Sequence, residues 1–535
     1  MAGVRGFASR LGSNAARALR QGTARVLLPR GRWWLRIRVP APLPELAPSV
    51  LLGREPTLSL LDVLQVLRSA ARDPRVAGAL VRFEGPLGGL ARAQALRRGL
   101  AEVRAAGKPA LVWADRLGAE ELVAASGASR LWLPESGSVL LVGVRLQSFF
   151  LRGLLDRLGV RAEVVRVGDY KSAGEMLTRE GMSAESREQL EALGEDLFET
   201  LVQEIADGRG IGADRVRELV DRGPFSARAA CELGLADGCL YPDELEAELL
   251  RLAPDVGEPD AVPLVDASTY LAVRASDPGW RPLLRELPRV AYVVASGPIH
   301  GGRSWRGVAS DAYRGLLERL RRDERVRGIV LRVESPGGDA VASDLLWRAL
   351  RHVGESKPVV ASMGDVAASG GYFLAAGAHA ILAERASLTG SIGVVGGKLD
   401  LSRLYERLGV TKEVVERGAR AGLLAEERGF TPDERRAVRQ EMSALYGLFV
   451  DRVATGRNLS RDAVHEAGRG RVWSGGRARE LSLVDALGGP LEALEELRRR
   501  AGIGLGDPLV IETHPRVPRL LSLRGVLRSW FLHTP

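Results

Sequence analysis

One serine of the chain stands where a nucleophile could be activated. Ser369 lies within residues 364–377, Gly-Asp-Val-Ala-Ala-Ser-Gly-Gly-Tyr-Phe-Leu-Ala-Ala-Gly, after an apolar strand-like run and at the start of a helix of small residues. The two glycines that follow it let another backbone approach closely, and the amino end of a helix favours developing negative charge. Ser369 is therefore a candidate nucleophile, although serine is also a common N-cap residue.

A glycine-containing turn earlier in the chain could complete such a site. Residues 334–339, Glu-Ser-Pro-Gly-Gly-Asp, follow another apolar run and break it sharply. The N–H groups of Gly337 and Gly338, with that of Gly370, could hold the oxyanion of a tetrahedral intermediate. Ser-Pro-Gly-Gly also suits an ordinary turn. The oxyanion interpretation is favoured because the strand before this turn immediately precedes the serine-bearing strand in the expected order.

The base that would activate the serine is better sought among the lysines than among the histidines. No motif places a supporting acid beside any histidine; they stand at positions 300, 352, 379, 465, 514 and 533. A desolvated lysine can act as a base near neutral pH because burial lowers the pKa of its amine. Only five of the 76 cationic residues are lysines, and Lys171 lies in a turn, Gly-Asp-Tyr-Lys-Ser-Ala-Gly-Glu, that leads into a helix. Taken alone, Lys171 would be interpreted as an exposed surface residue.

The chain contains an internal duplication. Residues 75–89 return as residues 325–339 with seven of fifteen positions identical, and residues 158–168 return as 408–418 with seven of eleven identical. Both pairs are offset by 250 positions. Two blocks in one register indicate two duplicated domains.

Strand-like and helical runs alternate within each repeat, which predicts an α/β fold with a largely parallel sheet. In the second repeat, for example, apolar runs at 328–333 and 358–362 alternate with helical patterns at 343–353 and 370–378. A chain of 535 residues is also long enough for two cores. We predict the following segments: a basic stretch at 1–32, a first half at 33–251 with Lys171, a connector at 252–287, a second half at 288–505 with Ser369, and a basic amphipathic tail at 506–535.

The duplication also predicts where the two reactive groups meet. A local offset of 249, set by Lys108-Pro109 and Lys357-Pro358, places Glu120 opposite Ser369, and the 250 offset places Ala421 opposite Lys171. Each half would then keep one member of the pair. Such a split is expected if an ancestral oligomer had active sites between its subunits and one composite site was retained after fusion, so the halves should face each other.

Composition narrows the functional classes. The net charge is +9 and the isoelectric point 9.9, but 71 of the cations are arginine and no basic block with interleaved aromatics occurs, so we expect no nucleic-acid binding. Cys231 and Cys239 form neither a zinc nor a redox motif and are expected to be buried structural residues. We expect no metal and no cofactor.

The two ends of the chain suggest contact with a membrane surface. No run of about 18 apolar residues and no signal-peptide core occurs in the sequence. Residues 1–32 carry seven arginines and no acid, with apolar residues at helical spacing, and residues 520–531 repeat this pattern. We therefore predict peripheral membrane association; a frayed basic leader is the alternative for residues 1–32.

The motifs together resemble a known family. Tyr-Lys-Ser-Ala in the first half, with Ser-Pro-Gly-Gly, Ala-Ser-Gly-Gly-Tyr, Leu-Thr-Gly-Ser-Ile-Gly-Val and Val-Trp-Ser-Gly-Gly-Arg-Ala in the second, closely resemble the long bacterial form of signal peptide peptidase A. The resemblance covers residues 33–505 and implies two tandem domains of the Clp-protease and crotonase superfamily. It implies a Ser369–Lys171 dyad, an oxyanion hole at Gly338 and Gly370, and Ser391 as a residue that could orient the amine, although Ser391 also suits a turn.

The same resemblance implies a substrate and an assembly. It implies degradation of residual signal peptides at the membrane by a homo-oligomer, such as a tetramer, without a cofactor. The family's long form usually has an N-terminal membrane-spanning anchor, and this chain lacks such a segment. Two other functions stay open: a crotonase-type acyl-thioester enzyme, which would use the same pair of N–H groups, and a catalytically inactive scaffold at the membrane surface.

Overall fold

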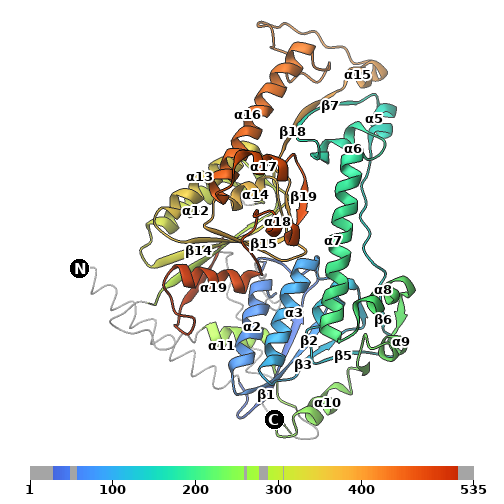
Figure 1. Cartoon of the computed structure of the whole chain (residues 1–535), viewed down its shortest axis with the longest axis vertical. Coiled ribbons are helices and arrows are strands. Elements are labelled where there is room, and N and C mark those ends of the chain that lie inside the picture. The colour runs from blue at the N-terminus through green and yellow to red at the C-terminus, as the bar shows by residue number, and fades with distance from the viewer. Residues whose placement is uncertain (1–27, 49–56, 258–261, 276–286, 305, 516–535) are drawn as a thin grey trace, which may run out of the picture.

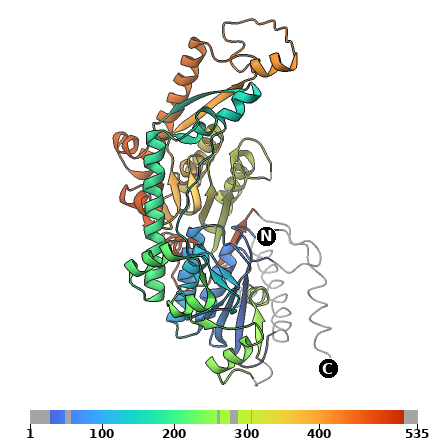
Figure 2. The same cartoon turned by 90° about the vertical axis from the view of Figure 1, so that its right-hand side faces the viewer.

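The computed structural model describes residues 28–48, 57–257, 262–275, 287–304 and 306–515. Most of the predicted basic stretch at 1–32, and residues 516–535 of the predicted tail, lie outside these ranges. Within them the molecule is elongated, with the sheet of the first half in the lower part of Figure 1 and that of the second half above it (Figures 1 and 2). No helix in this part of the chain combines the length and the apolar character needed to cross a membrane.

A parallel six-stranded sheet, ordered β10-β1-β2-β3-β5-β9, forms the centre of the first half. Its strands are β1 (Trp33–Val39), β2 (Val76–Phe83), β3 (Ala110–Trp113), β5 (Arg130–Leu133), β9 (Gly238–Cys239) and β10 (Leu264–Asp266). Helices α2 (Leu60–Arg72) and α3 (Leu90–Ala105) cover one face, and α10 (Leu245–Leu252) packs on the other. Burial on both faces explains why the central strands β2 and β3 are almost continuously apolar.

The second half contains an eight-stranded sheet with the main order β19-β17-β15-β14-β11-β21; off this order, β16 pairs with β15 and β20 pairs with β16. Its strands are β11 (Arg289–Ser296), β14 (Val326–Ser335), β15 (Val359–Ala368), β16 (Ala380–Ala383), β17 (Leu388–Gly390), β19 (Val472–Ser474), β20 (Ala486–Leu487) and β21 (Val510–His514). Helices α12 (Ser310–Arg322), α13 (Ala340–Gly354) and α14 (Gly370–Ala375) pack on one face. The other face meets α19 (Pro490–Arg500) and shares one apolar core with α2 and α3, so the two halves are joined by packed side chains.

A strand from each half forms a separate antiparallel pair that links the halves. β7 (Arg161–Val167) of the first half pairs along its whole length with β18 (Val394–Asp400) of the second. Two long helices follow in the two halves, α7 (Ala184–Arg209) and α16 (Pro432–Arg457). In Figures 1 and 2, α7 runs from the first sheet along the flank of the second half toward β7. Lys171 lies between β7 and α7, and this arrangement places it next to the second half.

The remaining described elements are short. They are β4 (Arg116–Leu117), α4 (Ala119–Ala125), β6 (Ser138–Val139), α5 (Arg152–Leu158), a 3-10 turn (Ser172–Gly174), α6 (Glu175–Thr178), α8 (Ala213–Arg222), β8 (Phe225–Ser226), α9 (Ala227–Glu232), α11 (Ala267–Ala275), β12 (Ile299–His300), β13 (Val308–Ala309), α15 (Ser402–Leu408), α17 (Arg461–Ala467) and α18 (Gly475–Glu480).

The predicted α/β alternation is confirmed, and the structure differs from the sequence-based interpretation in three places. Part of the predicted connector forms β10, which lies beside β1, and part of the predicted tail forms β21, which lies beside β11. Both are edge strands of three to five residues, too short for periodicity to reveal. The prediction that both cysteines are buried is wrong, because Cys239 is exposed and Cys231 is partly exposed.

Candidate active site

Ser369 lies at the junction between β15 and α14 in a conformation that is rare for a residue other than glycine. Its backbone has φ 54° and ψ −120°. The N–H of Ser369 donates to the carbonyl of Gly390 at 2.9 Å, and its carbonyl accepts the N–H of Phe373 at 2.8 Å. The residue occupies the N-cap position, but its side chain makes no capping hydrogen bond. Backbone strain of this kind persists where surrounding structure enforces it, often at functional sites.

The buried side chain of Lys171 reaches across from the first half to Ser369. Nζ of Lys171 lies 2.9 Å from Oγ of Ser369 and 3.0 Å from both Oγ and the carbonyl oxygen of Ser391. Lys171 is 5% exposed, which excludes the surface interpretation. Ser391 follows β17 with φ 52°, and its N–H donates to the carbonyl of Arg471 at 2.6 Å. The structure thus brings together three residues that are far apart in the sequence.

Burial gives the amine of Lys171 the properties of a base. Desolvation lowers the pKa of Lys171 from 10.5 to about 8, and no charged group of the described chain adds to this shift. Gly470 packs directly on Lys171, since a β-carbon at position 470 would lie 2.5 to 2.7 Å from backbone and Cβ atoms of Lys171. Because the charged form is disfavoured, a sizeable fraction of the amine is neutral in mildly alkaline solution.

The N–H groups of Gly338 and Gly370 lie close together next to Ser369. A β-carbon on Gly370 would lie 3.2 Å from the backbone nitrogen of Gly338, so the two amides are close neighbours. Among the described residues, neither N–H donates to another backbone group. The N–H of Gly337, the third donor that the sequence suggested, donates instead to Oγ of Ser335 at 3.2 Å. Gly338 and Gly370 thus remain as candidates for binding an oxyanion.

The turn that carries Gly338 is held by a short parallel bridge. The N–H of Ile299 donates to the carbonyl of Gly337, and the N–H of Asp339 donates to the carbonyl of Ile299, both at 2.9 Å. A β-carbon on Gly338 would lie 2.0 Å from the carbonyl oxygen of Ile299. Only glycine fits there, which explains the second glycine of the Ser-Pro-Gly-Gly motif.

The strand pairing around the equivalent position in the first half shows that the predicted alignment was wrong by one residue. β4 pairs with β6 through Arg116 and Ser138, and β15 pairs with β17 through Val366 and Leu388, so the offset here is 250 and not 249. Ala119, and not Glu120, is therefore the counterpart of Ser369. The sequence offset was misleading because β15 has one more residue between Ser362 and Val366 than the first half has between Trp113 and Arg116.

Glu120 nevertheless fills the pocket of the first half. Its Oε2 accepts the N–H groups of Gly88 at 3.2 Å and Gly89 at 3.0 Å. Gly88 is the counterpart of Gly338 in the 250 register. Ala421 is the counterpart of Lys171 as predicted, because its N–H donates to Gly418 as that of Lys171 donates to Gly168.

Sequence reasoning missed a buried ion pair that joins the halves beneath the site. Arg332 on β14 is 1% exposed, and its guanidinium donates to both carboxylate oxygens of Glu45 at 2.9 and 2.8 Å. Breaking a buried pair by removing one partner is strongly destabilising because the other charge stays buried. Arg82 and Arg332 occupy equivalent positions in the two repeats, which was the sequence feature that could have drawn attention to Arg332. Arg82 itself is exposed and stacks on Trp113, so the two arginines have different environments.

A carboxylate on the serine-bearing strand also binds the first half. Asp365 of β15 accepts the N–H of Ala91 at 2.9 Å and that of Arg92 at 3.3 Å, at the start of α3. Burial raises the pKa of Asp365. Burial also raises the pKa of neighbouring Glu334, to about 7. These contacts hold β15 against the half that supplies Lys171.

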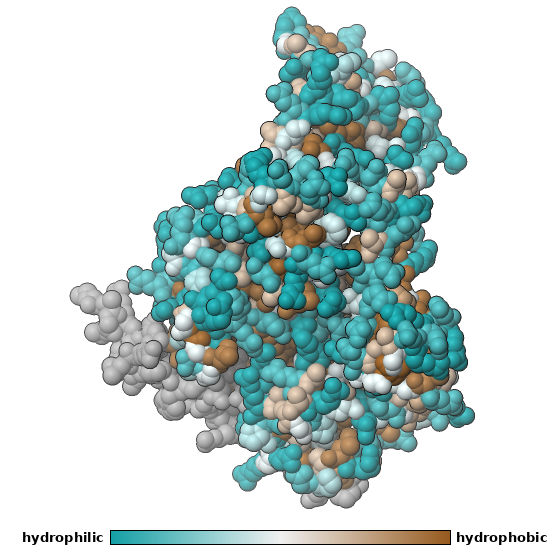
Figure 3. Space-filling model, viewed as in Figure 1, coloured by the Kyte–Doolittle hydropathy of each residue, from teal (hydrophilic) through white to brown (hydrophobic). Residues whose placement is uncertain are grey.

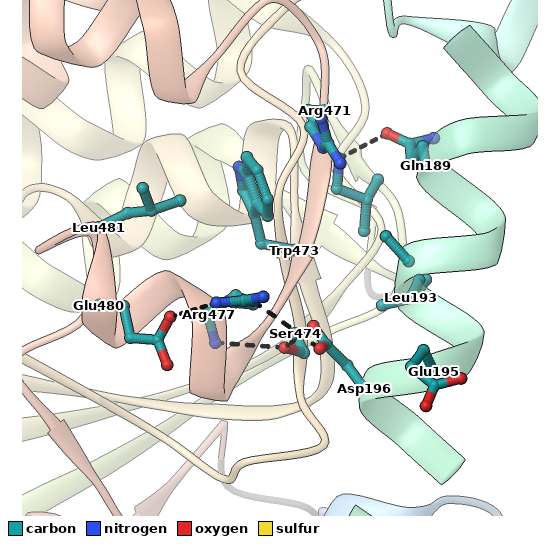
Figure 4. Close-up of a pocket in the computed structure, with 12 residues that line it drawn as sticks. Gln189, Leu193, Glu195, Asp196, Arg471, Trp473, Ser474, Arg477, Glu480 and Leu481 are labelled. Atoms are coloured by element: carbon teal, nitrogen blue, oxygen red, sulfur yellow. Dashed lines mark hydrogen bonds and ion pairs between the residues drawn. The ribbon is translucent and has the colours of Figure 1, made fainter. Parts of the chain in front are cut away.

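A cavity of about 370 Å³ lies between α7 and the segment β19–α18 (Figure 4). Leu193, Trp473 and Leu481 give it an apolar lining, and Oγ of Ser474 donates to Asp196 at 2.7 Å across the two halves. Ser369, Lys171 and Ser391 are not among its lining residues. The cavity therefore belongs to the contact between the halves rather than to the dyad.

Comparison with known proteins gives a consistent result. The family model described as Peptidase family S49 matches residues 102–253 and again residues 351–504. "Serine protease SPPA, chloroplastic" of Arabidopsis thaliana is 34% identical over 85% of this chain and 67% of its own length. "Protease 4" of Haemophilus influenzae is 28% identical over 82% of this chain and 72% of its own. A protein of Enterococcus faecium named as a signal peptide peptidase is 34% identical over 37% of this chain and 57% of its own.

Proposed function

Because the chain belongs to peptidase family S49, with the family's domain present twice, we propose that it is a serine endopeptidase in which Ser369 is the nucleophile and Lys171 the general base. The observation that carries the assignment is the 2.9 Å contact between Nζ of Lys171 and Oγ of Ser369 in a buried setting. A nucleophile within hydrogen-bond reach of a base whose pKa is lowered is the arrangement that acyl transfer requires.

In the first step, the neutral amine of Lys171 takes the proton of Ser369 as Oγ attacks the carbonyl carbon of the peptide bond. The carbonyl oxygen becomes an oxyanion, which the N–H groups of Gly338 and Gly370 stabilise. When the intermediate collapses, the C–N bond breaks and the ammonium of Lys171 gives its proton to the leaving amine. The acyl group then remains on Ser369 as an ester.

In the second step, Lys171 takes a proton from water as the water oxygen attacks the ester. The C–O bond to Ser369 breaks, the proton returns to Oγ, and the carboxylic product leaves. Ser391 positions the amine through both its carbonyl and its hydroxyl oxygen, each 3.0 Å from Nζ. Two contacts from one residue restrict the rotation of a long, flexible side chain, which favours the reactive geometry.

The substrates we propose are residual signal peptides and other short or unfolded peptides, cleaved at a membrane surface by a homo-oligomer that associates peripherally. The printed name of the relative from Enterococcus faecium supports the substrate class. The basic, amphipathic ends of the sequence support contact with anionic lipid, although both lie largely outside the described residues. The serine–lysine contact favours a peptidase over an acyl-thioester enzyme or an inactive scaffold.

Labelling with a serine-directed fluorophosphonate, followed by intact-mass measurement and peptide mapping, tests the assignment. We expect one adduct, at Ser369, and cleavage of a signal-peptide substrate; both should be lost in Ser369→Ala and in Lys171→Ala. Lys357→Ala is the matched control, because Lys357 is also partly buried and donates to carbonyls of Leu320 and Asp323 away from the site. Normal labelling of Lys171→Ala would refute the dyad.

A further inference from the structure

A group of three side chains joins the two halves beside the dyad. Arg471, which directly precedes β19, donates through its guanidinium to Oε1 of Glu188 on α7 at 2.8 Å. The other carboxylate oxygen of Glu188 accepts the hydroxyl of Tyr170 at 2.9 Å. The guanidinium of Arg471 also lies 4.8 Å from the ring centre of Tyr170. Because Tyr170 directly precedes Lys171, these three side chains, here called the clamp, tie the lysine-bearing turn to the second half.

The backbone of the same segment contacts the residue that holds the amine. The carbonyl of Arg471 accepts the N–H of Ser391 at 2.6 Å. Ser391 in turn contacts Nζ of Lys171 through its hydroxyl and its carbonyl oxygen. The carbonyl of Arg469 accepts the N–H of Tyr170 at 2.8 Å. The segment before β19 therefore bonds to both turns whose separation sets the position of the amine.

The duplication supplies the clamp positions twice, but only one set can form the contacts. α7 and α16 are offset by 248 positions, and so are α9 and α18. With these offsets, and with the 250 register for the lysine-bearing turn, the counterparts of Tyr170, Glu188 and Arg471 are Arg420, Arg436 and Gly223. Two arginines and a glycine can form neither the ion pair nor the ring contact. The clamp is thus kept where a lysine follows it and lost where Ala421 stands instead.

We propose that Glu188 and Arg471 are positioning residues for the reaction. Their ion pair holds the turn of Lys171 against Ser391, which keeps the amine within reach of Ser369. This inference rests on the proposed function, in which that amine is the base. A displacement of about 1 Å can lower a rate about 100-fold, and a lysine side chain is long and flexible. A contact that fixes the turn therefore affects catalysis without touching the substrate.

The clamp can be changed without opening the core. The side chains of Arg471 and Glu188 are 18% and 55% exposed. α7 lies beside β19 on the face shown in Figure 1, and Figure 3 shows that hydrophilic residues predominate on this face. A partly exposed ion pair or cation–π contact changes an equilibrium by up to about fivefold. We therefore expect labelling of Ser369 to slow about two- to fivefold in Glu188→Ala and about 5- to 25-fold in Arg471→Ala, which loses both kinds of contact.

The pH profile separates positioning from a direct effect of charge. Burial alone lowers the pKa of Lys171 to about 8. Two further ion pairs flank the turn, Arg166–Glu175 and Asp169–Arg469, and neither contributes to that pKa. A loosened turn admits water, so the midpoint of the profile should rise in both variants. A midpoint at about pH 9 instead of about pH 8 lowers the neutral fraction about tenfold at pH 7 and hardly at all at pH 10.

A direct charge effect would have a different signature. Glu188→Ala removes a negative charge and Arg471→Ala removes a positive charge, so charge effects on the lysine would move the two midpoints in opposite directions. The clamp instead requires both midpoints to rise. It also requires the double variant to react no more slowly than Arg471→Ala, because the two residues act as a unit.

Fluorophosphonate labelling of the full chain between pH 7 and pH 10 tests the clamp. The rate constant at Ser369 is measured for the unmodified protein, for both single variants and for the double variant, with circular dichroism confirming the fold. Arg471→Lys, which keeps the charge, should react faster than Arg471→Ala. Glu199→Ala is the matched control, because Glu199 lies on the same helix and accepts from Arg217 of the first half at 2.5 and 3.2 Å. Its rate and midpoint should stay those of the unmodified protein.

The outcomes distinguish the clamp from the proposed function. Unchanged rates and midpoints in both clamp variants, or midpoints that move in opposite directions, would overturn the clamp alone, provided that the unmodified protein is labelled at Ser369 and Lys171→Ala is not. Lack of lysine-dependent labelling in the unmodified protein would overturn both. If Arg471→Ala does not fold, Glu188→Ala decides the question, since the side chain it shortens is more than half exposed.

Discussion

The pH dependence of the reaction of Ser369 tests the role of Lys171 quantitatively. Burial lowers the pKa of this amine to about 8, and the proposed base is its neutral form. With that pKa, about one tenth of the amine is neutral at pH 7, about half at pH 8 and about nine tenths at pH 9. The rate should therefore rise about fivefold from pH 7 to 8, less than about twofold from pH 8 to 9, and then level off.

The assay is the second-order rate constant for inactivation by a fluorophosphonate, which reports on nucleophile activation without a peptide leaving group. An exposed lysine would instead give about a tenfold rise per pH unit up to about pH 10. Lys357→Ala should keep the profile of the unmodified protein. A continued tenfold rise through pH 9, or a plateau already reached at pH 7, would refute the assignment of Lys171 as a desolvated base.

Three further outcomes are expected. Ser391→Ala should slow inactivation by about 2- to 12-fold, because one hydrogen bond contributes about 0.5–1.5 kcal/mol and the backbone carbonyl at position 391 still holds the amine; an unchanged rate would contradict its positioning role. Ala119→Ser should leave intact-mass labelling at one adduct per chain, because Ala421 supplies no amine; two adducts would show that the second pocket is competent. Washing membranes with high salt or carbonate should release the protein into the supernatant, since we expect charged amphipathic ends to bind it; retention in the pellet would contradict peripheral association.

The parts of the site that could be predicted from the sequence are those that depend on local backbone geometry. Ser-Pro-Gly-Gly can be recognised because Gly338 tolerates no β-carbon beside Ile299, and glycines after Ser369 follow from the same need for close approach. The rarity of lysine singled out Lys171 among cations that are nearly all arginine. The contact between these residues was predictable from the family resemblance and, independently, from the duplication, which requires the halves to face each other.

The parts that could not be predicted depend on contacts between segments that are distant in the sequence. Nothing near Arg332 indicates that Glu45 neutralises it, because the two are 287 positions apart. The offset of 249 was correct along β3 but failed beyond it, since the second half has one additional residue within β15, between Ser362 and Val366, which no sequence motif marks. Periodicity likewise cannot reveal that β7 pairs outside its own half, because the alternation of residues in a strand does not identify the strand with which it pairs.

The first-half pocket shows how one site of the pair could become purely structural. In the second half, we propose that the N–H groups of Gly338 and Gly370 bind a transient negative charge, whereas in the first half the N–H groups of Gly88 and Gly89 donate to the carboxylate of Glu120. A permanent acceptor gives both N–H donors a partner, which stabilises the turn. The same carboxylate excludes a substrate carbonyl from that position. Restoring Ser at 119 alone therefore leaves two obstacles, the occupied donors and the missing amine at 421, so the first half is expected to serve as the support that delivers Lys171 to the second.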